Sequence, residues 1–273
     1  MPGVATVYRW ELFKLRHQKR TYLGFGASII VPILFVIAIH LRRHHERGGG
    51  FAFSDYLDRS GLAVPLVILL FGSIWLFPLI TALVAGDIFA SEDHNGTLKT
   101  ILTRSLERWQ LFAGKALAAA SYAVAAILLC GTVGVLAGSL QSGFHPLQSL
   151  SGTVVSAPKA TELVYVSLLI YLIPIVTLVF IGILLSTLFH NSAAAVVGTL
   201  MVSLVFQLIG VLPGLSGTQP YLLSTQFNAW QGLLRTPVDW APIVHSVWVC
   251  AMYGVPALVV AFLLFIRRDV AGG

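Results

Sequence analysis

The sequence predicts an all-α integral membrane protein with six transmembrane helices and an N-terminal interfacial helix. Of its 273 residues, 57% are hydrophobic and only 10% are charged, whereas soluble domains average about 25% charged residues. Six apolar runs are each near or above the roughly 20 residues that a spanning helix needs. A membrane β-barrel would need alternating segments of about ten residues, and the sequence contains none. Lipid is therefore the expected solvent for most of the surface.

The helices are expected in the following order along one transmembrane domain, residues 1–273. A basic helix, WELFKLRHQKR, precedes the first apolar run and suits a membrane interface. The third run is long enough to tilt strongly or to protrude from the bilayer. The fourth and fifth runs are separated by the short break FHNS, which indicates a tight helical hairpin. The predicted spans are residues 22–40, 62–86, 111–140, 163–189, 192–212 and 243–266.

Two further features concern the ends and connections of these runs. Cys130 and Cys250 both lie inside apolar runs, so we expect buried thiols and no disulfide. The connection 213–242 is rich in Tyr, Trp, Phe and Leu, which favour the membrane interface. We expect this external connection to form one or two short helices lying in or dipping into the outer leaflet.

The distribution of Lys and Arg predicts the orientation. Eleven of these residues lie before the first run, between the second and third, and after the sixth, against six in the other connections. The positive-inside rule therefore places both termini in the cytoplasm, with the chain spanning the plasma membrane several times. Basic flanks facing anionic lipid account for the net charge of +6 without a nucleic-acid partner.

The most highly charged stretch, residues 91–110, lies between the second and third runs. Asn95 and Gly96 form a turn pair, and Thr97 can cap a short helix that follows. This amphipathic helix needs a partner for its apolar face, either lipid headgroups or another protein. The residues that share this face at helical spacing are Leu98, Ile101 and Leu102.

Residues 86–115, GDIFASEDHNGTLKTILTRSLERWQLFAGK, resemble the intracellular segment of ABC-2 type transporter permeases, the membrane subunits of type V ABC exporters. The shared pattern is an acidic stretch, Gly-Thr-Leu, a short helix, and Gly-Lys at the start of the next span. This chain has Arg104-Ser105 where many relatives have Arg-Pro. The resemblance implies that the segment is a coupling helix docking on a separate ATPase subunit. The contact residues it implies are Glu92, Leu98, Ile101, Leu102 and Arg104.

The resemblance also implies the function. The chain would be the permease subunit of an ATP-binding cassette exporter for an amphiphilic cargo, such as a drug, antibiotic, lipid or peptide. Two permease copies, most simply a homodimer, would each bind one ATPase subunit, and ATP and Mg²⁺ would bind to that partner. The chain is not itself expected to be an enzyme, because its one Gly-Lys pair, Gly114-Lys115, lacks the other residues of a phosphate-binding loop. The alternative is a membrane sensor or assembly scaffold that binds a cytoplasmic partner through residues 91–110.

Polar residues inside the spans suggest a candidate translocation path. Thr199, Ser203 and Gln207 recur every four residues on the fifth helix, and Tyr171 adds polarity to the fourth. Such residues line transport paths, but they also form hydrogen bonds between packed helices, and packing is the simpler interpretation. No cofactor and no metal ion is expected. The histidines of HLRRHHERGGG, residues 40–50, would suit a transition metal, but a basic, glycine-rich external loop is the favoured interpretation.

Overall fold

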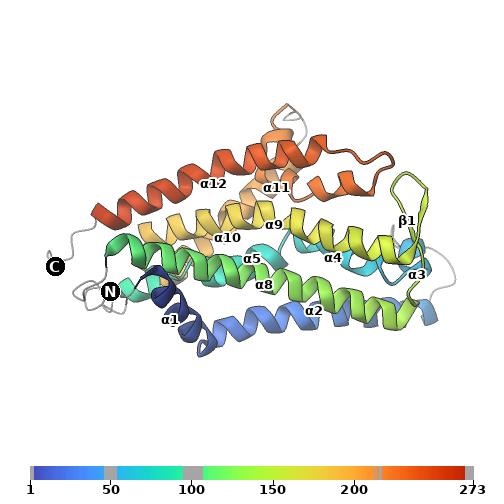
Figure 1. Ribbon diagram of the computed structural model, residues 1–273, viewed down its shortest axis with the longest axis horizontal. Coiled ribbons are helices and arrows are strands. Elements are labelled where there is room, and N and C mark those ends of the chain that lie inside the picture. Colours follow the sequence, from blue (N-terminus) through green and yellow to red (C-terminus); the bar gives the residue numbers. More distant parts are fainter. Residues whose placement is uncertain (1–2, 46–53, 95–106, 213, 215–216, 268–273) are drawn as a thin grey trace.

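The computed structural model describes residues 3–45, 54–94, 107–212, 214 and 217–267 as a bundle of long helices (Figure 1). Two of the helices, α8 and α9, run most of the length of the bundle, and the other long helices pack around them. The elements are α1 Val4–Arg16, α2 Lys19–His45, α3 Ser54–Arg59, α4 Ala63–Gly72, α5 Leu76–Ala85, α6 Ala90–His94, α8 Arg108–Ser142, β1 Leu147–Gln148, β2 Val154–Val155, α9 Ala157–Leu188, α10 Ser192–Val211, η1 Gln219–Tyr221, α11 Leu223–Gln226, η2 Ala229–Leu234 and α12 Ala241–Arg267.

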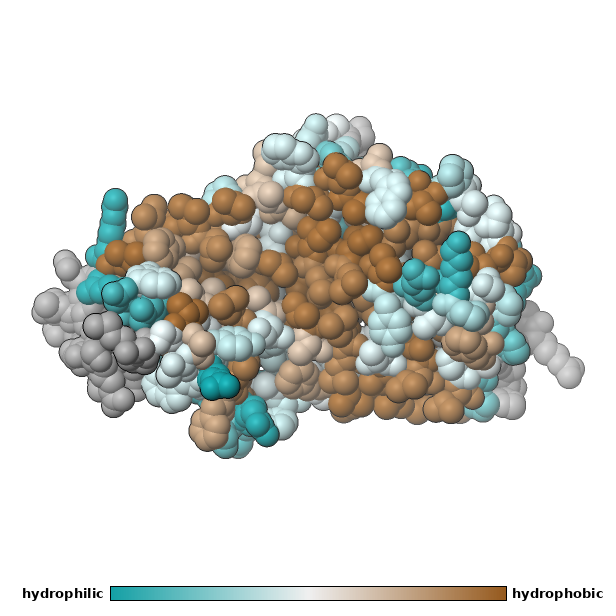
Figure 2. Space-filling view, in the orientation of Figure 1, coloured by the Kyte–Doolittle hydropathy of each residue, from teal (hydrophilic) through white to brown (hydrophobic). Residues whose placement is uncertain are grey.

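The predicted membrane-spanning architecture is confirmed. Within the described residues, five single helices are long and apolar enough to cross a membrane, and the bent pair α4–α5 makes a sixth candidate. On the face that Figure 2 shows, hydrophobic residues cover the middle of the molecule, and hydrophilic residues gather toward its two ends. This arrangement suits a bilayer, where lipid covers the apolar belt and water covers the ends.

The second predicted span differs from the expectation of one continuous helix over residues 62–86. The structure divides it into α4 and α5, which are bent by 63° at a short break. Pro78 explains the break, because a proline has no N–H to donate and its ring clashes with the carbonyl four residues earlier, here that of Ile74. Side chains from other helices bond the exposed backbone: the Tyr171 hydroxyl donates to the Leu69 carbonyl at 3.2 Å, and Gln207 Nε2 donates to the Ser73 carbonyl at 3.2 Å.

Helix α8 approaches the turn before α4 closely where two glycines meet. A Cβ added at Gly138 of α8 would lie 2.2 Å from the Gly61 carbonyl oxygen, and one added at Gly61 would lie 2.1 Å from the Gly138 carbonyl oxygen. The two backbones are therefore in direct contact, and no larger side chain fits there. Cys130 and Cys250 are free and buried, as predicted.

The connections at the end of the bundle away from α1 are also folded (Figure 1). The strands β1 and β2 form a small antiparallel hairpin, a minor departure from an all-helical chain. Short helices do follow the fifth span, but the described residues form three of them, η1, α11 and η2, where one or two were expected. Their apolar side chains turn inward, since Phe227 and Trp230 are both buried. The Leu150 amide donates to the Leu234 carbonyl at 3.0 Å and joins the hairpin to η2.

Helix α1 is the predicted N-terminal helix, and it lies across the start of α8 (Figure 1). Val7, Glu11 and Leu15, one per helical turn, are buried, whereas Trp10 and Phe13 are exposed on the outer side. The Tyr8 hydroxyl lies 2.9 Å from the Ser121 hydroxyl of α8. The buried face of α1 thus contains a carboxylate, which requires a partner inside the bundle.

Candidate functional site

Four charged side chains meet where α1, α6 and α8 come together, and we name Glu11, Lys14, Glu92 and Lys115 the ion cluster. Lys115 Nζ lies 2.9 Å from Glu11 Oε1 and 2.7 Å from Glu92 Oε1, and Lys14 Nζ lies 2.5 Å from the same Glu92 oxygen. The Lys115, Glu11 and Glu92 side chains are 0%, 2% and 3% exposed. Two acids and two bases balance one another, which is the condition under which buried charges are tolerated.

The local sequence of α8 explains why Lys115 reaches both acids. Gly114 lets α1 approach closely, because a Cβ there would lie 2.6 Å from Val7 Cγ1. Glu11, one turn after Val7, then lies beside Lys115. On the other side, Lys115 Nζ also donates to the Ile88 carbonyl at 3.3 Å and lies 5.6 Å from the centre of the Phe89 ring. In the Gly-Lys pair, Gly114 therefore allows close helix packing and Lys115 forms ion pairs. The residues around the pair are not those of a phosphate-binding loop.

The electrostatics of the cluster favour the ionised form of Glu92. Burial on its own raises the pKa of the Glu92 carboxyl, but the charges of Lys115 and Lys14 and their hydrogen bonds outweigh burial and hold this pKa below its ordinary value. The ion pairs of Glu92 with Lys115 and Lys14 are consequently present at neutral pH, and Glu92 keeps α6 attached to α1 and α8.

A second charged contact lies next to the cluster and reaches two other helices. One carboxylate oxygen of Asp87 pairs with Arg20 near the start of α2, and the other accepts a hydrogen bond from the Ser192 hydroxyl at the start of α10. The Ser186 hydroxyl of α9 accepts hydrogen bonds from the Phe89 and Ala90 amides, each at 3.0 Å. We call residues 86–94 the stem. The stem is bonded to α1, α2, α8, α9 and α10.

The stem leads directly into the predicted coupling helix. Of the predicted ATPase contacts, Leu98, Ile101, Leu102 and Arg104 lie outside the described residues. Glu92 is described, and its side chain is buried among the lysines of this chain instead of facing outward. Its predicted contact with another subunit stays a prediction, while its contacts within the chain define a structural role.

The predicted path residues face the interior of the chain. Tyr171, Thr199 and Ser203 are buried, and Gln207 is partly buried. The Thr199 hydroxyl donates to the Ala195 carbonyl of its own helix at 2.8 Å. The structure brings Tyr171 and Gln207 together at one place, the break between α4 and α5, where both donate to backbone carbonyls. These contacts agree with the packing interpretation, and lining of a path stays a prediction.

Sequence reasoning did not identify the pairing of the stem, although signals were present. An acid at position 11 lies on the same helical face as Val7 and Leu15, and a lysine at position 115 lies inside an apolar run. A charge on an apolar face usually has a buried partner. In the part of the chain that the structure describes, no group of three or more His, Cys, Asp or Glu side chains is placed to hold a metal ion. The side chains of His44, His45 and Glu46 lie outside that part.

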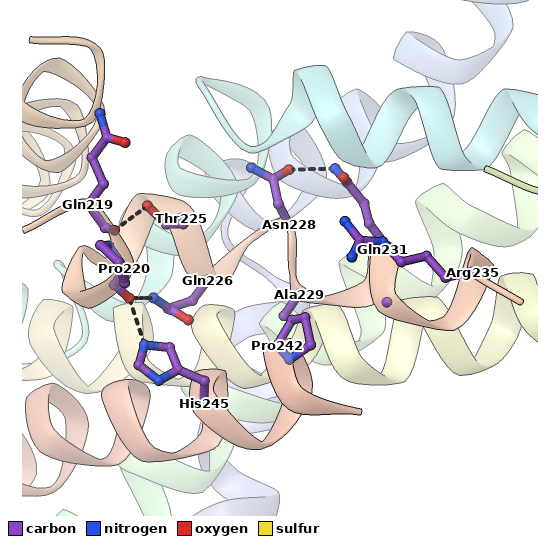
Figure 3. A pocket seen from close by; sticks show the side chains of 11 residues that line it. Gln219, Pro220, Thr225, Gln226, Asn228, Ala229, Gln231, Arg235, Pro242 and His245 are labelled. Atoms are coloured by element: carbon purple, nitrogen blue, oxygen red, sulfur yellow. Dashed lines mark hydrogen bonds between the residues drawn. The ribbon is translucent and has the colours of Figure 1, made fainter. Parts of the chain in front are cut away.

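A pocket of about 370 Å³ lies at the other end, between the segment 219–235 and the start of α12 (Figure 3). Three of its polar side chains, those of Thr225, Gln226 and His245, bond to the backbone of the segment itself. Gln226 Nε2 donates to the Pro220 and Leu222 carbonyls at 2.7 and 2.9 Å, and His245 Nε2 lies 2.9 Å from the Pro220 oxygen. The pocket wall is thus made by groups that hold the short helices in shape.

Residues 8–207, well over half of the chain, match the model of a family described as ABC-2 family transporter protein. The match extends from α1 through most of α10 and includes the stem, the ion cluster and residues 95–106. No protein with a curated description matches the chain.

Proposed function

The chain belongs to the ABC-2 family of transporter membrane proteins, and on that premise we propose that it is the permease subunit of an ATP-binding cassette exporter, coupled to its motor through residues 91–110. It is a multi-pass membrane protein, and membership implies an ATPase partner, since permease domains of this family typically lack a catalytic ATPase site. We infer that ATP and Mg²⁺ bind to that partner, and that two permease copies pair with two ATPase subunits.

The observation that carries this proposal is the anchoring of both ends of the segment. On the N-terminal side, Glu92 is held by Lys115 and Lys14. On the C-terminal side, Arg108 donates to the Ile266 carbonyl at 2.5 Å, and Phe112 stacks on Phe89 with 5.4 Å between ring centres. A docked subunit moves the membrane helices only when the segment between them is firmly attached to those helices. The anchoring meets this requirement.

The cargo is inferred from the family and from the membrane setting. We propose an amphiphilic molecule, such as a drug, antibiotic, lipid or peptide, that crosses the plasma membrane when ATP-driven closure of the motors changes the arrangement of the helices. The candidate path residues Tyr171, Thr199, Ser203 and Gln207 belong to this proposal.

Copurification of an ATPase subunit tests the proposal. Ile101→Asp and Leu98→Asp would place a carboxylate in the apolar contact that docks the segment, where an unpaired charge is costly. We expect both variants to insert into the membrane and to lose most of the copurified ATPase. Lys99→Ala, off the apolar face at helical spacing, is the matched control and should retain it.

Two outcomes would count against the proposal. Full retention of the ATPase by Ile101→Asp would mean that the motor docks elsewhere. Capture of a partner that contains no phosphate-binding loop, dependent on the same residues, would favour the alternative function of a membrane sensor or assembly scaffold.

A further inference from the structure

Among the ion pairs and hydrogen bonds described for the carboxylates of the stem, those of Asp87 join two different membrane-spanning helices, α2 and α10. Its side chain is almost fully buried. One oxygen pairs with Arg20 of α2, and the other accepts a hydrogen bond from Ser192, the first residue of α10. A carboxylate at a helix N-terminus also interacts favourably with the helix dipole. The stem is therefore attached to α10 by a charged hydrogen bond at the helix end.

Close backbone packing reinforces this attachment. A Cβ added at Gly86 would lie 3.0 Å from Val196 Cα and 3.1 Å from the Ala195 carbonyl oxygen. Nearby, a Cβ added at Gly182 of α9 would lie 2.9 Å from Ala85 Cβ and 3.3 Å from Thr199 Cγ2. At Gly86 the backbone of the stem is therefore in close contact with the first turn of α10. A displacement of the stem must move the start of α10 or break the contacts.

The far end of α10 is also linked to the broken span. Thr199 and Ser203 lie on the buried side of the helix, and Gln207 bonds the Ser73 carbonyl at the break. A movement that begins at Asp87 thus has a continuous route along α10 to the break between α4 and α5. Each step in this route is a packed or hydrogen-bonded contact.

We propose that Asp87 is a positioning residue that transmits movement of the motor-bound segment to α10 through Ser192, with Arg20 holding its second oxygen. This inference rests on the proposed function, in which residues 91–110 bind an ATPase subunit. It adds the element that responds, α10, and the atom pair through which the response starts. The ion cluster in turn keeps the stem attached to α1 and α8, so that the carboxylate stays in place.

Two serine variants provide a matched test, because each removes one serine hydroxyl that donates a hydrogen bond. Ser192→Ala removes the bond from α10 to the Asp87 carboxylate. Ser28→Ala, outside the segment proposed to bind the ATPase, removes a local bond, 3.0 Å long, to the Gly24 carbonyl within α2. Both changes delete one oxygen atom, so their effects on general stability should be similar, whereas only the first cuts the proposed route. Asp87→Asn serves as an additional variant that weakens both carboxylate contacts.

The readout is the accessibility of α10 in the complex with its copurified ATPase. Cys130 and Cys250 are replaced with Ala, and Leu208→Cys, on the exposed side of α10, is labelled with a maleimide before and after trapping of the nucleotide with vanadate. We expect trapping to change the labelling rate in the parent protein and in Ser28→Ala. In Ser192→Ala and Asp87→Asn that change should fall about tenfold, the scale of equilibrium shift that one hydrogen bond to a charged group supports.

The outcomes separate this inference from the proposed function. If Ser192→Ala and Asp87→Asn bind the ATPase and keep the full nucleotide-dependent change, the inference is overturned and the proposed function stands. If the parent protein binds no ATPase, both are overturned; if it binds the ATPase but its α10 labelling does not respond to trapping, only the inference is overturned. Loss of the response in Ser192→Ala, with ATPase binding and the Ser28→Ala response intact, supports the inference.

Discussion

Lys115 Nζ lies 2.7 Å from the Glu92 carboxylate and 2.9 Å from that of Glu11, and all three side chains are buried. The contact joins three parts of the chain that are distant in sequence: α1, α6 and the start of α8. It explains why a lysine stands inside an otherwise apolar run and why an acid occupies the inner face of α1. The same contact holds the start of segment 91–110, which we propose to bind the motor. The fold and the proposed coupling therefore both depend on Lys115.

The first prediction concerns that cation. Lys115→Met keeps most of the side-chain volume but leaves two buried carboxylates without their main partner, which should destabilise the protein by about 3–5 kcal/mol. Lys14→Met is the control, since Lys14 is 34% exposed and Glu92 would keep Lys115. Its expected cost is about 1 kcal/mol or less. Denaturant unfolding of the purified protein in detergent measures both, and equal losses in the two variants would contradict the prediction.

A second prediction follows from the lowered pKa of Glu92. In the unfolded chain this carboxyl titrates near its ordinary value of 4.5, and in the folded protein it titrates at lower pH. Below about pH 4.5 the unfolded state therefore binds more protons, so stability falls as the pH falls through the folded pKa. The contribution is fully present above the unfolded pKa.

Thermal unfolding of the parent protein and of Glu92→Gln, from about pH 7 down to about pH 3, tests this assignment. The variant should be less stable at neutral pH, because Lys14 loses its ion pair with Glu92 and Lys115 keeps only that with Glu11. It should also lose part of the acid-dependent decline. Parallel curves for the two proteins over the whole range would show that Glu92 does not contribute to that decline.

The spans were predictable because hydropathy is a property summed over about 20 residues and tolerates local variation. The break in the second span was not predicted, because apolar residues continue on both sides of Ser73 and Pro78 alone marks the position. The ion cluster was missed for a different reason. Glu11 and Lys115 are 104 positions apart, and no local pattern specifies which distant charges will meet.

For the predicted coupling helix and the stem, too, the sequence predicted one feature and missed another. The spacing of Leu98, Ile101 and Leu102 and the resemblance of residues 86–115 led to the family, which the family match confirms. Glu92 belonged to the same motif and was interpreted as an outer contact. In the structure its side chain is buried, because Lys14 and Lys115 pair with it there. Gly114 allows this by letting α1 pack closely against α8.

A third prediction tests the contact between glycines. Gly138→Ala places a methyl group against the Gly61 carbonyl, and a backbone atom cannot rotate away, so we expect a loss of about 1–3 kcal/mol in unfolding free energy. Gly26→Ala in α2 is the matched control, because nothing lies within 4 Å of a Cβ at that position. It should be neutral or stabilise the helix by up to about 1 kcal/mol. A neutral Gly138→Ala would show that α4 and α8 separate easily.

A fourth prediction concerns orientation. From the bias of Lys and Arg we expect both termini and Asn95 to be cytoplasmic, and Gly49, Ser151 and Thr218 to be external. Single cysteines are placed at Asn95, Ser151 and Thr218 after Cys130 and Cys250 are replaced. A membrane-impermeant thiol reagent applied to intact cells should label the latter two positions and leave the first unlabelled until the cells are opened. The reverse pattern would invert the assignment.

The last prediction concerns the broken span. Tyr171 is fully buried on α9, and its hydroxyl donates to the Leu69 carbonyl at 3.2 Å, where α4 approaches its end. In lipid, a backbone carbonyl without a partner is costly, because no water reaches it. Tyr171→Phe deletes the donor and keeps the ring contacts with Phe77 and Phe227, so the expected loss is about 1–3 kcal/mol.

Tyr165→Phe on the same helix is the control, since Tyr165 is 38% exposed, and its expected cost is about 0.5 kcal/mol or less. Gln207→Leu removes the second donor to the break, at the Ser73 carbonyl, and combining it with Tyr171→Phe shows whether the two bonds act together. Losses that exceed the sum of the single changes would mean that the break is held as one unit. A Tyr171→Phe variant as stable as Tyr165→Phe would mean that the Leu69 carbonyl finds another donor, and that the bend depends on Pro78 alone.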